Sequence, residues 1–147
     1  MQMTGQAASF APRIAVLIDA ENVSSRHAHD VVRTVQLVGG SVIYNAYGSE
    51  AVCQGWMSEL KVLKPRMITP ELTGKPNAAD MTMMLDAMVY LLRHKVTQMY
   101  LVTSDADFVP LVRKLKRYKC RTVVCAEAKA SETLRNACDE FVLLEKA

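Results

Sequence analysis

The chain has 147 residues, 50% of them hydrophobic, and this length and composition suit one globular domain with a substantial core. The formal net charge is +3, no apolar run reaches the roughly 20 residues of a membrane span, and residues 1–10 do not resemble a signal peptide. We therefore exclude a membrane protein and expect a cytoplasmic one, and the four cysteines, which lack CxxC spacing, indicate buried thiols rather than a zinc site or disulfides.

Short continuous apolar runs alternate along the chain with runs that have apolar residues every three or four positions. The first pattern is typical of strands buried on both faces, and the second is typical of helices. In chain order we expect a central strand at 13–18, a helix at 24–38, a strand at 41–47, a helix at 49–63, a strand at 66–69, a helix at 78–93, a strand at 98–102, a helix at 109–118, a strand at 121–125 and a helix at 131–137, with a short strand as an option at 141–144.

Such an alternation predicts an α/β fold: a single domain with an open, mostly parallel sheet, helices on both faces and right-handed crossovers. Residues 1–11 are expected to form a flexible tail ahead of a domain at 12–147. The loop at 71–77 contains glycine and proline and is expected to lie at the edge of the site, where Lys75 is placed to contact substrate.

Two of the expected helices carry apolar stripes. On the helix at 49–63, Val52, Trp56 and Leu60 form a stripe that is interpreted as part of the core, with a homodimer contact as the alternative. The helix at 78–93 is expected to pack against the core through a second stripe, formed by Met81, Met84, Leu85, Met88, Val89 and Leu92.

Acidic residues follow two of the predicted strands. Asp19 comes directly after the central strand, and Asp105 and Asp107 follow the strand at 98–102. The carboxyl ends of parallel strands share one edge of a sheet, so these acids are expected to converge there. Taken alone, the second motif also fits an ordinary aspartate-rich loop that caps a helix.

Asp80 lies in the first turn of a predicted helix, where the helix dipole favours an acid without any function. Its helix should begin at the edge that carries Asp19, and this makes it a further candidate. Asp86, six residues later, lies about one and two-thirds turns along the helix, and is either a hydrogen-bonding neighbour of the site or an exposed acid. Ser104 is likewise expected to be a hydrogen-bonding neighbour.

Asn22 follows Asp19 by three residues and has two interpretations. Its amide can hold Asp19 or position a phosphate or water, or it can cap the following helix. His27 and His29 follow the same turn and are expected on a solvated helix start, where either can touch a phosphate. No histidine lies near a credible nucleophile in this layout, which argues against a serine or cysteine hydrolase.

Converging carboxylates repel one another unless a cation joins them. A hard divalent ion, magnesium or manganese, suits such oxygen ligands and supports phosphodiester hydrolysis. A basic run at 113–121 offers cations for a negatively charged polymer, although a lone run is equally typical of a solvated helix face.

Three segments resemble the NYN domain, a branch of the PIN-like ribonucleases. They are residues 17–23 (Leu-Ile-Asp-Ala-Glu-Asn-Val), residues 104–111 (Ser-Asp-Ala-Asp-Phe-Val-Pro-Leu) and residues 131–141 (Ser-Glu-Thr-Leu-Arg-Asn-Ala-Cys-Asp-Glu-Phe), to which Lys75, Asp80 and Asp86 add single positions. The resemblance covers nearly the whole chain.

The resemblance implies metal-dependent endoribonuclease activity, with magnesium or manganese held by Asp19, Asp80, Asp105 and Asp107, and with Asn22 as a polar partner. It also implies a secondary role for Asp86. The expected substrate is single-stranded RNA, held by Lys75, Arg113, Lys114, Lys116 and Arg117. Similar bacterial proteins often join this domain to an RNA-binding module, so the domain either acts alone or relies on a fused module or a separate partner to select the RNA.

Two other functions stay open on the sequence alone. The domain can keep the fold and metal site yet bind RNA or a protein without useful turnover. A phosphatase on a doubly wound fold is the third interpretation, although the first strand ends in Asp-Ala-Glu and not in the Asp-x-Asp of a phosphatase nucleophile.

Overall fold

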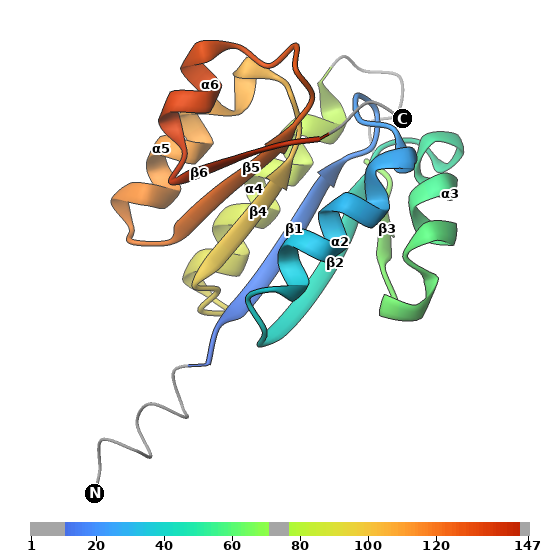
Figure 1. Cartoon of the computed structure of the whole chain (residues 1–147), viewed down its shortest axis with the longest axis horizontal. Helices are drawn as coiled ribbons and strands as arrows, with labels where there is room; N and C mark the ends of the chain where they lie inside the picture. The colour runs from blue at the N-terminus through green and yellow to red at the C-terminus, as the bar shows by residue number, and fades with distance from the viewer. Residues whose placement is uncertain (1–10, 71–76, 145–147) are drawn as a thin grey trace, which may run out of the picture.

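A six-stranded parallel sheet forms the centre of the computed structural model, which describes residues 11–70 and 77–144 (Figure 1). Across the sheet the order is β3-β2-β1-β4-β5-β6. The predicted α/β fold is confirmed, and the optional last strand is present. The strands are β1 (Arg13–Asp19), β2 (Ser41–Tyr47), β3 (Arg66–Ile68), β4 (Gln98–Val102), β5 (Arg121–Ala126) and β6 (Glu140–Leu143).

Helices cover both faces of this sheet, as the alternating pattern predicts (Figure 1). The helices α2 (Ala28–Gln36) and α3 (Glu50–Glu59) pack on one face. On the other face lie α4 (Ala78–Leu92), α5 (Val109–Arg117) and α6 (Glu132–Ala137). Short 3-10 turns complete the described elements: η1 (Ser25–His27), η2 (Lys61–Leu63) and η3 (Ala106–Phe108).

The strand order reverses between β1 and β4, and this reversal determines where a site can form. β1 pairs with β2 on one side and with β4 on the other, so that Ile18 is in register with both Ala46 and Val102. The two central strands therefore end at the same level. In open parallel sheets, ligands bind outside the carboxyl ends of the strands at such a switch point.

The prediction of which face of α4 packs against the core is wrong. The buried face contains Ala79, Met83, Ala87 and Leu91, whereas four of the six predicted core residues are exposed: Met81 (55%), Leu85 (69%), Val89 (48%) and Leu92 (58%). The helix is apolar almost all round, so no polar face indicates its orientation. The small side chains of Ala79 and Ala87 allow the helix to approach the sheet closely.

The stripe that contains Trp56 packs inside the protein. Trp56 is fully buried, and its indole N–H donates to the carbonyl of Val23 at 3.0 Å. The core interpretation is confirmed, so this stripe offers no surface for the alternative homodimer contact. A homodimer stays a prediction.

The four cysteines are free and buried, as their spacing indicates. Burial raises the pKa of each thiol, to about 11 for Cys53 and to about 12 for Cys125. Across 11–70 and 77–144, every helix is too short or too polar to cross a membrane. The N-terminal tail predicted at 1–11 falls almost wholly outside these described residues.

Candidate metal centre

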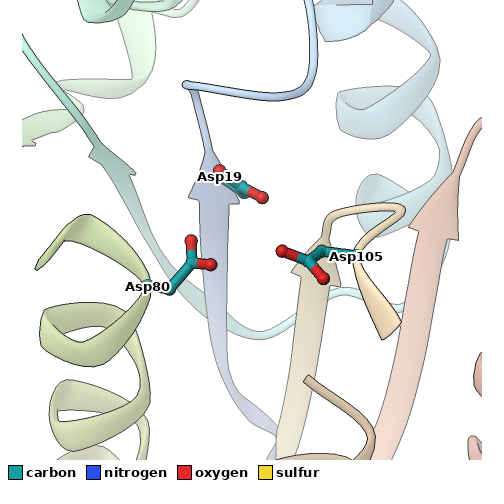
Figure 2. Close-up of side chains that lie close together, drawn as sticks. All are labelled: Asp19, Asp80 and Asp105. Atoms are coloured by element: carbon teal, nitrogen blue, oxygen red, sulfur yellow. The ribbon is translucent and has the colours of Figure 1, made fainter. Parts of the chain in front are cut away.

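Three carboxylates from distant parts of the chain meet at the switch point. Asp19 ends β1, Asp80 lies in the first turn of α4, and Asp105 follows β4. One oxygen of each lies within 4.8 Å of the others. Figure 2 shows the three side chains pointing toward one another from these elements. The structure therefore brings together three of the four acids that were predicted to bind metal.

Asp19 is held firmly at the end of the central strand. Its side chain is only 1% exposed, and both carboxylate oxygens accept hydrogen bonds. The amide of Asn22 donates to Oδ2 at 3.1 Å and to Oδ1 at 3.3 Å, and the hydroxyl of Thr103 donates to Oδ2 at 2.8 Å. Burial raises the pKa of Asp19, and the hydrogen bonds oppose that rise.

Thr103 is a site residue that sequence reasoning did not single out. It is fully buried, and its hydroxyl donates to Asp19 while accepting the backbone N–H of Asp105 at 3.1 Å. One side chain thus connects two of the three acids. The only sequence signal was its position directly after a buried strand, since its partner Asp19 lies 84 residues away.

Asp105 begins the turn η3 and caps it. Its Oδ1 accepts the backbone N–H of Asp107 at 2.9 Å, which fixes the start of the turn that leads into α5. Asp107 itself is exposed and does not belong to the three-carboxylate cluster. Its negative charge nevertheless contributes to the raised pKa of Asp80. A direct role for Asp107 in metal binding stays a prediction.

Asp80 has the most strongly perturbed carboxyl group of the cluster. Asp80 is 7% exposed. Burial is the largest cause of its raised pKa, and the charges of Asp19 and Asp105 add to it, giving a pKa of about 7. A carboxyl group with this pKa holds a proton that a cation would displace. Like charges this close cannot all ionise without compensation.

Residues 13–145, a segment that contains all three clustered acids, match the NYN domain family. The chain belongs to the NYN domain family. The match also covers both central strands, and it confirms the resemblance in the sequence motifs. The family carries a PIN-like nuclease fold.

Two proteins of uncharacterised function are similar to this NYN domain. An uncharacterised protein of Methanocaldococcus jannaschii is 29% identical over 139 residues, which cover 88% of this chain and 54% of that protein. The chain thus spans about half the length of this curated relative. A crystal structure of a protein of unknown function from Vibrio parahaemolyticus has a TM-score of 0.72 at 22% identity, covering 92% of this chain and 94% of the other, and supports the fold alone.

Asp86 of the NYN domain hydrogen bonds with β2 and not with the clustered acids. Its Oδ2 accepts the hydroxyl of Tyr47 at 2.8 Å. The amide of Asn45 donates to the hydroxyls of Tyr47 (3.1 Å) and Tyr90 (2.7 Å), which extends the buried network back to α4. These bonds fasten α4 to the sheet, and α4 carries Asp80.

A small hollow of about 160 Å³ lies beside the cluster, lined by Asn22, Ser104, Asp105 and Lys129. The hydroxyl of Ser104 accepts the backbone N–H of Glu127 at 3.0 Å and so connects the loops that follow β4 and β5. Sequence reasoning missed Lys129. Its position shortly after β5, whose end shares the edge with Asp19, was the available signal.

His27 corrects the sequence-based expectation of a solvated position. It is 1% exposed, and its Nε2 lies 2.9 Å from Oε2 of Glu127, whereas His29 is exposed as predicted. Glu127 also lies 3.8 Å from the ammonium of Lys129 and 3.9 Å from the guanidinium of Arg26. Glu127 therefore helps to position the cation that lines the hollow.

The predicted basic residues take different positions. α5 begins at the edge with the acids and runs away from it, with Arg113 and Lys116 lining a groove against α6 and with Lys114 and Arg117 exposed. Arg121 pairs with Glu140 instead. Lys75 lies outside the described residues.

The cluster fits a hard divalent cation. Three carboxylate oxygens within 4.8 Å of one another are the ligand type that magnesium and manganese prefer. Burial raises the pKa of both Asp19 and Asp80, and neighbouring carboxylates add to the rise through a repulsion that a bound cation would relieve. Asp19, Asp80 and Asp105 are the residues that would hold it.

Proposed function

We propose that this NYN domain is a metal-dependent endoribonuclease that hydrolyses phosphodiester bonds at the Asp19, Asp80 and Asp105 cluster. The observation that carries the proposal is the convergence of these carboxylates at the switch point of the sheet. Magnesium or manganese is the expected cofactor. When bound, such an ion would lower the pKa of a water and offset negative charge on the phosphate.

The residues around the cluster have separate tasks in this proposal. Asn22 and Thr103 keep the carboxylate of Asp19 in one orientation, because each donates a hydrogen bond to it. The hollow beside Asp105 offers the ammonium of Lys129 for an oxygen of the scissile phosphate, together with the polar side chains of Asn22 and Ser104. Asp107 lies on the solvent side, where it can act on a water or a further cation.

Single-stranded RNA is the proposed substrate. Exposed cations occur on α5, whose first turn follows directly from the loop that carries Asp105. The curated relative is nearly twice as long as the matched segment, so we expect a further module or a separate partner to select the RNA.

The test is cleavage of a circular single-stranded RNA by the purified protein in manganese or magnesium. A circle has no ends, so its linearisation identifies an endonuclease. We expect linear products that disappear with EDTA and with Asp105→Asn. Asp30→Asn is the matched control, because Asp30 lies on α2 and pairs with Arg33 away from the cluster.

The outcomes separate the candidate functions. Equal products from wild type and Asp105→Asn would assign the activity to a contaminant. RNA binding without cleavage in either metal would favour the binding module. Turnover of a small phosphate ester alone would favour the phosphatase.

A further inference from the structure

A groove of about 460 Å³ lies between α5 and α6. Its lining residues are Arg113 and Lys116 from α5 and Thr133, Asn136 and Ala137 from α6. The groove is distinct from the hollow beside the acids, because the two share no lining residue.

The chemistry of the groove is that of an anion site. Arg113 and Lys116 are three positions apart, close to one helical turn, and the same spacing relates Thr133 to Asn136. Each helix therefore turns two polar side chains toward the other. Together they supply a guanidinium, an ammonium, a hydroxyl and an amide, and no carboxylate belongs to the described residues that line the groove.

The two cations of the groove, Arg113 and Lys116, are not neutralised by ion pairs with acids among the described residues. Arg121, at the end of the same basic run, is by contrast paired with Glu140. An anion in the groove would thus meet two uncompensated positive charges.

The position of the groove relates it to the acidic cluster. α5 starts directly after the turn that carries Asp105, and α6 starts shortly after Lys129. Both helices then run away from the edge with the acids, on the same face of the sheet. Arg113 lies about 6 Å along α5 from its first residue, and Lys116 about 10 Å, at roughly 1.5 Å per residue.

We propose that the groove between α5 and α6 binds backbone phosphates of the single-stranded RNA that flanks the cleaved bond. The strand leaves the acidic cluster past Lys129 and continues between the two helices. The inference rests on the proposed nuclease function and adds the direction in which the substrate runs. Contacts to phosphate position a strand without reading its sequence.

The test measures the affinity for a labelled single-stranded RNA by fluorescence anisotropy, in an Asp105→Asn background that prevents cleavage. The groove variant is Arg113→Gln with Lys116→Gln. The matched control is Lys61→Gln with Lys64→Gln, since these cations are also three positions apart and exposed, and they follow α3 on the other face of the sheet.

We expect the groove variant to bind roughly tenfold more weakly at low salt, because two cations that neutralise phosphates have been removed. The slope of log affinity against log salt should shrink by about 0.7 for each phosphate of a single strand that is no longer neutralised. The control pair should change the affinity by less than about twofold.

A second variant tests the groove without removing a cation. Asn136→Asp places a carboxylate opposite Arg113 and Lys116, and should weaken RNA binding, whereas Asn136→Ser should weaken it much less. Far-ultraviolet circular dichroism and a thermal melt of each variant verify that the domain remains folded.

Equal effects of the groove pair and the control pair on affinity would overturn the inference, because binding would then depend on net charge alone. Absence of RNA binding by the protein would overturn it as well. Cleavage of circular RNA by an otherwise native groove variant with unchanged KM would leave the nuclease intact and contradict the groove as an RNA site. Selective weakening of binding in a protein that cuts no RNA would support the groove and refute the nuclease.

Discussion

The hydroxyl of Thr103 donates a 2.8 Å hydrogen bond to Oδ2 of Asp19, and this bond joins the ends of β4 and β1 across the switch point. The same hydroxyl accepts the N–H of Asp105. Two of the three acids are therefore positioned by one buried side chain. Mutation of a residue that hydrogen bonds a metal ligand typically lowers metal affinity by about 10- to 100-fold, because the ligand loses its orientation.

Replacement of Thr103 by valine should weaken both metal binding and the fold. Thr103→Val keeps the shape and removes the hydroxyl, so we expect Mn²⁺ affinity to fall roughly tenfold, with about 1–2 kcal/mol lost from the free energy of unfolding. Titration calorimetry measures the affinity. Thr122→Val is the control, since Thr122 is equally buried and donates to Cys120. Equal effects of the two changes on Mn²⁺ would refute the role of Thr103.

Asp80 should make the metal-free protein less stable at higher pH. Its folded pKa is about 7 against 3.8 for an ordinary aspartate, so between these values the folded state binds more protons than the unfolded state. The free energy of unfolding then falls as pH rises from about 4 to about 7. Thermal melts in EDTA at pH 5 and pH 8 measure this fall, which Asp80→Asn should reduce.

Manganese should reverse that trend, because the cation competes with the proton on Asp80. The increase in Tm produced by Mn²⁺ should be larger at pH 8 than at pH 5. A larger increase at pH 5 would contradict the assignment of Asp80 as a ligand.

The phase of α4 can be tested by two alanine substitutions that lie two positions apart on opposite faces of the helix. Met83 is fully buried, so Met83→Ala should cost about 2–4 kcal/mol of stability. Leu85 is 69% exposed, so Leu85→Ala should change stability by about 0.5 kcal/mol or less. Urea denaturation of both variants gives the comparison. A larger destabilisation by Leu85→Ala would restore the stripe that the sequence predicts.

The parts of the site that the sequence predicts correctly are those that depend on local pattern. The apolar run before Asp19 identifies a buried strand, and the rule that parallel strands end at one edge places Asp105 near it. The sequence did not predict which face of α4 is buried. A helix with apolar residues on every side has no polar face to mark the exposed side.

Contacts between distant segments were also beyond the reach of sequence patterns. Thr103 hydrogen bonds with Asp19, which lies 84 positions away in the sequence, and His27 with Glu127, which lies 100 positions away. Threonine and histidine near the start of a helix are ordinary capping or surface residues by composition. Only the strand order and register bring their partners within hydrogen-bond distance.

Asp86 should stabilise the position of α4 without binding the metal. It accepts the hydroxyl of Tyr47, and no hydrogen bond among the described residues joins it to Asp19, Asp80 or Asp105. Tyr47→Phe removes this donor and should cost about 1–2 kcal/mol while leaving Mn²⁺ binding within a few-fold of wild type. Asp86→Asn should behave similarly, whereas Asp80→Asn should lower Mn²⁺ affinity by at least about tenfold. If Asp86→Asn weakened Mn²⁺ binding as much as Asp80→Asn, with stability unchanged, Asp86 would have to be counted among the metal ligands.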